Sequence, residues 1–359
     1  MQNTALLTWG ASDSLLSTYQ SQPDLSLGRV ITQERGQYTV ITATGERAGV
    51  PSGKLLYNTA DITTLPGVGD WVLLAGDDQL GVIQQVLPRT SCIVRKAAGR
   101  EQRGQVIATN VDTVFICMAM NADFNLRRLE RYLAVVWESG AAPVVVLTKS
   151  DLATDRDAQL TEVERIAIGA EMIATSAYEN SGMDRVREHI RPGVTIAFIG
   201  SSGVGKSTLV NTLVGAEVLA TKGLRNDGQG RHTTTHREAI LLPGGGVLID
   251  TPGMRELGLE TADIDRTFSD IEELASQCRF ADCGHQREPG CAVQAAVRTG
   301  DLDAARLASW RKLGNEVDYA GKSSRQITDE KINRIFGGKA GQKAARKEFK
   351  SREKSRMGY

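Results

Sequence analysis

The sequence predicts three folded units in order along its 359 residues: a small β-barrel, an α/β domain with a parallel sheet, and a helical module. Short apolar runs separated by glycines predict the barrel over residues 26–105. Apolar runs typical of buried strands alternate with helical stripes over residues 106–262, which indicates the α/β domain. A cysteine cluster marks the third unit, residues 263–336. Residues 1–25 are expected to form an irregular lead-in, and residues 337–359 a basic tail that is disordered when free.

The composition limits where the protein can work. Apolar residues make up 41% of the chain, enough for real cores. The sequence has no run of about eighteen apolar residues that could cross a membrane. Its N-terminal stretch lacks the basic start and apolar core of a secretion signal. Five cysteines, three of them clustered, fit a reducing compartment better than a disulfide framework. We therefore expect a cytoplasmic protein without membrane contact, and we expect it to be a monomer.

Positive charge gathers at one end of a chain whose net charge is zero. Residues 339–359 contain eight Lys or Arg and two Asp or Glu, a net charge of +6, so residues 1–338 carry −6. Such a tail attracts a phosphate backbone without reading its sequence. A solvated tail that has no partner is the alternative interpretation.

The barrel is predicted to be of the OB type, because its short strands are separated by glycine turns. The runs that predict these strands are residues 29–33, 38–43, 70–75 and 80–86. OB barrels often bind single-stranded nucleic acid, but aromatic side chains that would stack on bases are few here, so nucleic-acid contact and simple packing both stay open. A basic segment follows the barrel and is interpreted either as a phosphate contact or as a solvated linker: Arg89, Arg95, Lys96, Arg100 and Arg103.

The α/β domain is expected to open with a buried strand at residues 111–118. An apolar helical stripe follows at residues 126–137, and Asn125 is placed to cap its first turn. The next buried strand is predicted at residues 143–147.

Residues 200–208, with the sequence GSSGVGKST, form the strongest motif of the chain. They follow the apolar run 194–199 and lead into the helical run 209–214, which is the context that a phosphate-binding loop requires. The glycines let backbone N–H groups surround phosphates, and the helix N-terminus adds partial positive charge. Lys206 is expected to reach the terminal phosphates and Ser207 to bind Mg²⁺. The residues predicted to contact the nucleotide are Gly200, Ser201, Ser202, Gly203, Val204, Gly205, Lys206, Ser207 and Thr208.

A base-reading segment is predicted at Thr148, Lys149, Ser150 and Asp151, at the end of a parallel strand, where such sheets bind ligands. The tetrapeptide resembles the guanine-specificity motif of GTPases, with threonine in place of the commoner asparagine. The Asp151 carboxylate can accept from the ring N–H and the exocyclic amine of guanine, a donor pair that adenine lacks. The stem of Lys149 is expected to lie along the base. The competing interpretation is an ATP-using enzyme with the same phosphate loop, and Asp151 argues against it.

Three further segments complete the predicted nucleotide site. Ser176 and Ala177 resemble the small-residue loop that backs the guanine base. Asp250 and Gly253 resemble the DxxG segment of GTPases, in which the aspartate holds Mg²⁺ through water and the glycine amide contacts the γ-phosphate. The segment 228–236 is rich in Gly and Thr, as a mobile switch would be. One of its threonines is expected to bind Mg²⁺, and Thr234 is our choice among Thr233, Thr234 and Thr235.

The residue that would orient the attacking water is not the usual one. Many GTPases place a glutamine directly after DxxG, but this chain has Met254, which cannot hydrogen-bond water as an amide would. We therefore expect slow intrinsic hydrolysis of GTP. His232 in the switch segment is our hypothesis for the water-positioning group, and a histidine that only bonds to backbone is the alternative.

The order of the motifs indicates a circular permutation. An ordinary GTPase begins with the phosphate loop, whereas here the guanine motif at 148–151 and the loop at 176–177 come first. A fold with adjacent termini tolerates such a rearrangement. The join is predicted at the short turn 191–193. As a consequence, the DxxG segment runs directly into the C-terminal module.

The C-terminal module carries Cys278, Cys283, His285 and Cys291, a CX₄CXHX₅C cluster. Four soft or borderline ligands this close together suit one structural Zn²⁺, which would supply folding energy to a small segment. Buried cysteines beside a surface histidine are the alternative, and a redox role is disfavoured because no CxxC is present. Helices are expected at 265–275, at 302–313, where apolar side chains share one face, and near 332–336.

Taken together, these motifs resemble the RsgA family of circularly permuted GTPases, also called YjeQ or YloQ. The resemblance covers about residues 27–320 and depends on seven motifs in order: PGVGDWV (66–72), VLPRTS (86–91), TKSD (148–151), GSSGVGKST (200–208), GRHTTT (230–235), DTPG (250–253) and the cysteine cluster. It implies an α/β P-loop GTPase domain, circularly permuted, with an N-terminal OB-type β-barrel and a C-terminal α-helical zinc-binding domain.

The resemblance also implies a function. The family's members hydrolyse GTP to GDP, with Mg²⁺ as cofactor and one structural Zn²⁺ per chain, and the 30S ribosomal subunit stimulates hydrolysis. They act in late 30S maturation near the decoding region of 16S rRNA. The second interpretation is a GTP-gated RNA-binding module whose hydrolysis is incidental.

Overall fold

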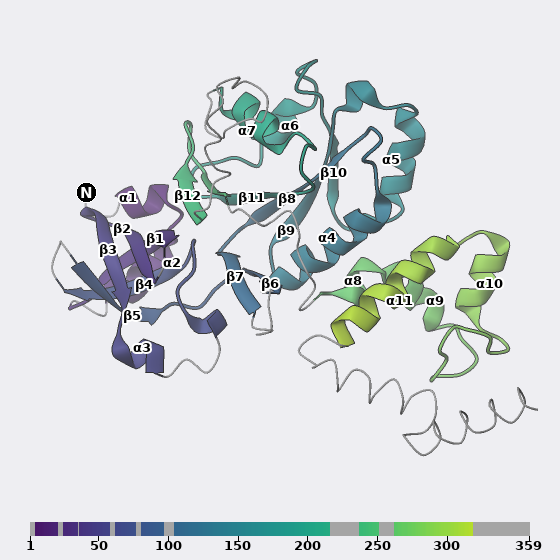
Figure 1. Cartoon of the computed structure of the whole chain (residues 1–359), viewed down its shortest axis with the longest axis horizontal. Coiled ribbons are helices and arrows are strands. Elements are labelled where there is room, and N and C mark those ends of the chain that lie inside the picture. The colour runs from purple at the N-terminus through teal and green to yellow at the C-terminus, as the bar shows by residue number, and fades with distance from the viewer. Residues whose placement is uncertain are drawn as a thin grey trace, which may run out of the picture.

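One continuous sheet runs through the barrel and the α/β domain, with the C-terminal module at the far end of the molecule (Figure 1). The computed structural model describes residues 4–20, 24–34, 36–57, 62–76, 80–96, 104–215, 237–250 and 262–318. Within them, the strand order is β10-β9-β8-β11-β13-β12-β1-β2-β3-β5-β4, and a further pairing of β1 with β4 closes the last five strands into a barrel.

The α/β domain contributes the parallel part of this sheet. Its strands are β8 (Thr113–Ala119), β9 (Ala142–Thr148), β10 (Glu171–Ala174), β11 (Thr195–Ile199) and β13 (Val247–Asp250), with β12 (Arg237–Leu241) antiparallel beside β13. Helices α4 (Leu126–Ser139) and α5 (Arg156–Glu164) cover one face, while α6 (Met183–Arg187) and α7 (Lys206–Val214) cover the other. Because both faces of the sheet are covered, the central strands β8, β9 and β11 are almost entirely apolar and buried, as the sequence predicts.

Helix α4 is fixed at both ends. The Asn125 side chain accepts from the backbone N–H of Arg128 at 3.0 Å, which confirms the expected cap. Gly140 ends the helix in the left-handed conformation, with φ of 84°. Along the buried face, Leu129 and Leu133 pack in one cluster with Val114 and Ile116 of β8. This capped helix therefore lies directly against the centre of the sheet.

The barrel has one strand more than the sequence predicts. Its strands are β1 (Ser26–Glu34), β2 (Gln37–Thr42), β3 (Gly45–Pro51), β4 (Trp71–Gly76) and β5 (Leu80–Val86). Between β3 and β4 the chain forms α3 (Gly53–Tyr57) and the short helix η1 (Ile62–Thr64). Strand β3 has no apolar run, since its sequence is GERAGVP, and only its pairing with β2 and β5 makes it a strand. The barrel interior is built from Val30, Tyr38, Val40, Val72, Leu74 and Ile83.

The expectation of an irregular lead-in is wrong for the described part of residues 1–25. Two short helices, α1 (Thr4–Thr8) and α2 (Asp13–Gln20), lie against the barrel. Leu6 and Leu16 are buried there in a cluster with Trp71. The Ser12 hydroxyl accepts from the Leu15 N–H at 3.2 Å and so caps α2. Burial of a few leucines thus orders a segment whose average polarity suggested a loose end.

A buried arginine joins the barrel to the α/β domain. Arg29 of β1 donates to the Gly69 carbonyl at 3.2 Å, to the Asn110 carbonyl at 3.3 Å and to the Thr195 hydroxyl at 2.8 Å, and it also donates to the Trp9 carbonyl. Burial lowers the pKa of Arg29 to about 10, although nearby carboxylates oppose the shift. Four segments that are distant in sequence therefore meet at one guanidinium, at the start of β11.

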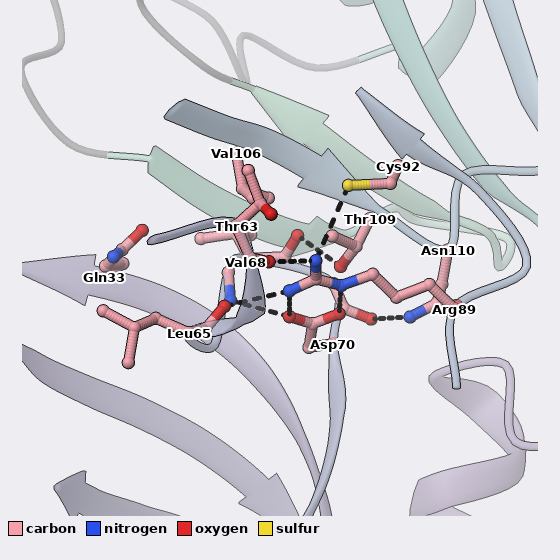
Figure 2. A network of polar contacts seen from close by, with 12 residues as sticks. Gln33, Thr63, Leu65, Val68, Asp70, Arg89, Cys92, Val106, Thr109 and Asn110 are labelled. Carbon is pink, nitrogen blue, oxygen red and sulfur yellow. Dashed lines mark hydrogen bonds and ion pairs between the residues drawn. The ribbon is translucent and has the colours of Figure 1, made fainter. Parts of the chain in front are cut away.

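The basic segment after the barrel is partly structural. Figure 2 shows the Arg89 guanidinium facing the Asp70 carboxylate, with which it makes two bonds of 2.8 and 2.7 Å. Arg89 also donates to the carbonyls of Thr63 and Leu65, at 2.5 and 2.9 Å. Asp70 is fully buried, so removal of either partner would leave the other charge unpaired and lower the free energy of unfolding by about 3–5 kcal/mol. Both interpretations of Arg89, as a phosphate contact and as part of a solvated linker, are therefore wrong.

The rest of that segment forms a hairpin. Strand β6 (Cys92–Lys96) pairs antiparallel with β7 (Gly104–Thr109), so the predicted boundary at residue 105 falls inside a strand. Arg95 of β6 donates to the Gln105 side chain of β7 at 3.2 and 3.3 Å. Arg100 and Arg103 lie outside the described residues.

The C-terminal module contains α8 (Ile264–Thr267), α9 (Ser269–Ala275), α10 (Ala292–Thr299) and α11 (Ala304–Asp318). The single helix expected at 265–275 is broken at Phe268, whose buried side chain belongs to the same cluster as Leu129 of α4. Arg306 of α11 donates to Glu130 of α4 at 3.0 Å and to Asp270 of α9 at 2.5 and 2.7 Å. The module is thus attached to α4 by a shared core and a buried ion pair.

Among the helices that the structure describes, none is long and apolar enough to cross a membrane.

Candidate functional site

The phosphate-binding loop connects β11 to α7. Gly200 has a φ of 141°, and a Cβ there would lie 2.3 Å from the Cys117 carbonyl oxygen, so this position requires glycine. Gly203 and Gly205 also have positive φ, 83° and 101°, values that other residues rarely adopt. The backbone of the loop is therefore shaped by its glycines, as the sequence predicts.

Lys206 folds back over the start of this loop. Its Nζ donates to the carbonyls of Gly200 and Ser201, at 2.6 and 2.7 Å. The ammonium is thereby placed at the first two residues of the loop, although it belongs to the first turn of α7. Burial raises the pKa of the Cys117 thiol behind the loop to about 12, against the opposing charge of Lys206. Cys117 is a neutral packing residue there.

The segment 148–151 lies against the phosphate-binding loop. Thr148 Oγ1 donates to the Val204 carbonyl at 2.5 Å, and Lys149 Nζ donates to the Gly203 carbonyl at 2.7 Å. Thr148 ends β9 and is buried, so the threonine at this position makes the contact between the two loops. Two segments about fifty residues apart in the sequence therefore form one surface at the carboxyl ends of the parallel strands.

Asp151 is oriented by the loop that follows β10. The Ser176 hydroxyl donates to Asp151 Oδ1 at 2.6 Å, and the Ser150 N–H donates to the Thr175 carbonyl at 3.0 Å. Asp151 lies in the short helix η2 (Ser150–Leu152), and its carboxylate is exposed. Among the described residues, Oδ2 has no hydrogen-bond partner. A carboxylate held on one oxygen and exposed on the other can accept from a ligand's adjacent donors.

Ser207 and Asp250 supply oxygen atoms near the same edge. Ser207 is the second residue of α7, and Asp250 ends β13, the strand that pairs with β11. Hydroxyl and carboxylate oxygens are the ligands that Mg²⁺ prefers, so the donor set fits this ion.

Several predicted site residues lie outside the described residues. They are His232, Thr233, Thr234, Thr235, Gly253 and also Met254.

Two residues near the loop were missed by the sequence analysis. Arg128, in the first turn of α4, donates from Nη1 to both carboxylate oxygens of Asp123 at 2.9 Å, and it also donates to Ser201 Oγ. Ser201 Oγ in turn donates to Asp123 Oδ2 at 3.0 Å. No motif marks these residues, because the contact joins a helix to a loop more than seventy residues away.

The second site is the cysteine cluster. Ligand atoms of Cys278, Cys283, His285 and Cys291 all lie within 4.8 Å of one another. His285 Nδ1 is 3.5 Å from the sulfurs of both Cys278 and Cys291, and these two sulfurs are 3.8 Å apart. Tetrahedral Zn²⁺ with Zn–S bonds of about 2.3 Å holds its sulfurs about 3.8 Å apart. The four residues can therefore hold a metal ion.

The cluster is held by local structure. His285 has a φ of 53°, and its carbonyl accepts from Gln294 Nε2 at 2.7 Å and from Arg311. Cys291 is the N-cap of α10, its sulfur accepting from the Gln294 N–H. Helices α10 and α11 thus fix the cluster from one side.

The parallel sheet, the glycine-shaped loop and the order of the two segments that meet there define a circularly permuted GTPase. The comparisons agree, since the sequence model of the RsgA GTPase family matches residues 86–260. The chain belongs to the RsgA GTPase family, and it is a GTP hydrolase.

Relatives and solved structures extend this likeness beyond the central domain. The chain is 47% identical to the small ribosomal subunit biogenesis GTPase RsgA 2 of Lactiplantibacillus plantarum, over 96% of this chain and 98% of that protein. It is 46% identical to the small ribosomal subunit biogenesis GTPase RsgA of Opitutus terrae, over 82% of this chain and 84% of that protein. The crystal structure of YjeQ from Thermotoga maritima has a TM-score of 0.60 and 26% identity, covering 83% of this chain and all of that one. The structure of YloQ, described as a circularly permuted GTPase, has a TM-score of 0.57 and 25% identity, covering 82% and 95%.

Proposed function

We propose that this protein hydrolyses GTP in the assembly of the small ribosomal subunit, and that the 30S subunit stimulates its turnover. The observation that carries the proposal is the contact of Thr148 and Lys149 with the phosphate-binding loop beside an exposed Asp151 oxygen. This contact supports a site in which the Asp151 carboxylate would read the base beside the backbone that would bind the phosphates. The small-subunit role is supported by the names of relatives that align over nearly the whole chain.

The nucleotide and its Mg²⁺ would be held by residues from five segments. Residues 200–208 would surround the phosphates, with Lys206 at the terminal phosphates, while Asp151 and Lys149 would hold the guanine base, backed by Ser176 and Ala177. When bound, Mg²⁺ would neutralise charge between the phosphates, and Ser207 and Asp250 would hold it. We also propose Thr234 for the magnesium and Gly253 for the γ-phosphate, on the motif alone.

His232 is proposed to position the attacking water, because Met254 cannot do so. An imidazole nitrogen can accept a hydrogen bond from water at neutral pH, whereas a thioether sulfur is a weak acceptor.

The proposed function predicts a rate that depends on the ribosomal subunit. Hydrolysis of GTP by the wild-type chain is expected to be slow alone and to rise by at least about tenfold when purified 30S subunits are added, since a group that orients water supplies this order of effect. The measurement is phosphate release with 30S, with 50S and with no subunits. Equal rates in all three would remove the ribosomal role. A 30S-bound chain whose single-turnover rate does not rise would instead favour a GTP-gated RNA-binding module.

The same assay separates the role of His232. The His232→Ala variant should keep GTP binding and lose most of the stimulated rate of hydrolysis, because the substitution removes the group that would orient the attacking water and leaves the nucleotide contacts in place. An unchanged stimulated rate would exclude His232 from the mechanism.

We propose that the cysteine cluster binds one structural Zn²⁺, which would add folding energy to the C-terminal module. Purified protein is expected to contain about one zinc per chain by elemental analysis, and Cys283→Ser to lose zinc and melt at a lower temperature. Cys92→Ser is the matched control, since Cys92 lies outside the cluster. Equal zinc content in the wild type and Cys283→Ser would contradict the assignment.

We further propose that the protein works as a cytoplasmic monomer and contacts 16S rRNA. The net charge of +6 on residues 339–359 supports a contact with a phosphate backbone.

A further inference from the structure

A third cation lies at the phosphate-binding loop besides Lys206 and Lys149. The guanidinium of Arg128 contacts Ser201 and is paired with Asp123. Ser201 is therefore held from two sides, since its carbonyl accepts from Lys206 at 2.7 Å while its hydroxyl lies between Asp123 and Arg128. The Arg128 side chain is 31% exposed, so water and ligands reach it.

The contacts of the loop indicate which end faces the terminal phosphate. Residues 203 and 204 accept from Lys149 and Thr148, so the base would lie toward that end of the loop. Residues 200 and 201 accept from Lys206, the residue proposed for the terminal phosphates. Arg128 contacts residue 201, and thus it lies at the end of the loop where the γ-phosphate would be.

Arg128 also has hydrogen-bond donors to spare. Only its Nη1 is used, and among the described residues Nε and Nη2 have no partner. A planar guanidinium with several free donors suits the oxygen atoms of a phosphate.

We propose that Arg128 donates to the γ-phosphate of GTP and thereby distinguishes GTP from GDP. The inference rests on the proposed GTP site. GDP has no γ-phosphate, so in the GDP complex the guanidinium keeps its contacts with Ser201 and Asp123. Arg128 therefore adds affinity for GTP and none for GDP.

The test compares two nucleotides across four variants. Dissociation constants for GDP and for the non-hydrolysable imidodiphosphate analogue of GTP are measured with Mg²⁺ for the wild type, Arg128→Ala, Arg128→Lys and Arg131→Ala. Arg131 is the matched control, because it lies one turn along α4 and pairs with Glu316. Arg128→Ala is expected to raise the dissociation constant of the GTP analogue by at least about tenfold, while the dissociation constant of GDP changes by less than about twofold. Arg128→Lys should recover part of the loss, and Arg131→Ala should change neither constant.

The outcomes separate the two proposals. If Arg128→Ala weakens the binding of both nucleotides equally, or of neither, Arg128 has no role in sensing the γ-phosphate. If the wild type binds neither nucleotide, the proposed GTP site is overturned, and this inference with it. Should Arg128→Ala unfold, Arg128→Gln gives the same comparison, because it can still donate to Ser201 but carries no charge; the same selective loss is expected.

Discussion

The Lys206→Ala variant is expected to lose GTP hydrolysis by at least about a hundredfold, the order of effect seen when one charge-stabilising donor is removed from an active site. The lysine ammonium would otherwise stabilise the charge that develops on the transferred phosphoryl group. The fold should survive, since the Nζ contacts with the carbonyls of Gly200 and Ser201 can be replaced by water once the side chain is gone. Single-turnover phosphate release and a thermal melt measure the two effects.

Lys312→Ala is a suitable control for this variant, because Lys312 is an exposed lysine on α11, away from the loop. It should hydrolyse GTP at the wild-type rate. A Lys206→Ala protein that keeps the wild-type rate would show that the loop is not the phosphate site.

The Asp151→Asn variant is expected to exchange its base preference from guanine to xanthine. Xanthine carries a carbonyl where guanine carries the exocyclic amine, and an asparagine amide donates to a carbonyl where a carboxylate cannot. A site that leaves a ligand donor unpaired discriminates strongly, so affinity for GTP should fall by at least about a hundredfold while affinity for xanthosine triphosphate rises. Displacement of a fluorescent nucleotide by each triphosphate measures both constants.

Asp155→Asn is the matched control for that exchange. Asp155 caps α5 by accepting from the Ala158 N–H at 3.1 Å, and asparagine caps a helix about as well. The control should bind GTP as the wild type does. Unchanged guanine preference in Asp151→Asn would mean that another group reads the base.

The nucleotide loops could be predicted because each depends on a short run of residues with a strict backbone requirement. Gly200 can only be glycine in this conformation, and the position of the loop after β11 follows from the apolar run that forms the strand. The convergence of residues 148–151 with 200–208 follows from the parallel sheet, because the carboxyl ends of its strands meet at one edge.

The features that were missed depend on tertiary contacts. Strand β3 has no apolar pattern and exists through its two neighbours. Arg29 and Arg89 look like ordinary surface arginines in the sequence, yet Arg29 is buried against carbonyls of distant segments and Arg89 is half-buried against Asp70. The contact of Arg128 with Ser201 is of the same kind, since nothing local marks either residue as a partner of the other.

The direct test of the central claim is a competition between guanine and adenine nucleotides for the wild-type chain. The claim is that residues 148–151 and 200–208 hold one guanosine triphosphate. Bound fluorescent GDP is displaced by GTP or by ATP in the presence of Mg²⁺. The account predicts that GTP displaces it at a concentration at least about a hundredfold lower than ATP, because adenine lacks the donor pair that Asp151 accepts from. Displacement by ATP at the same concentration as GTP would contradict the account.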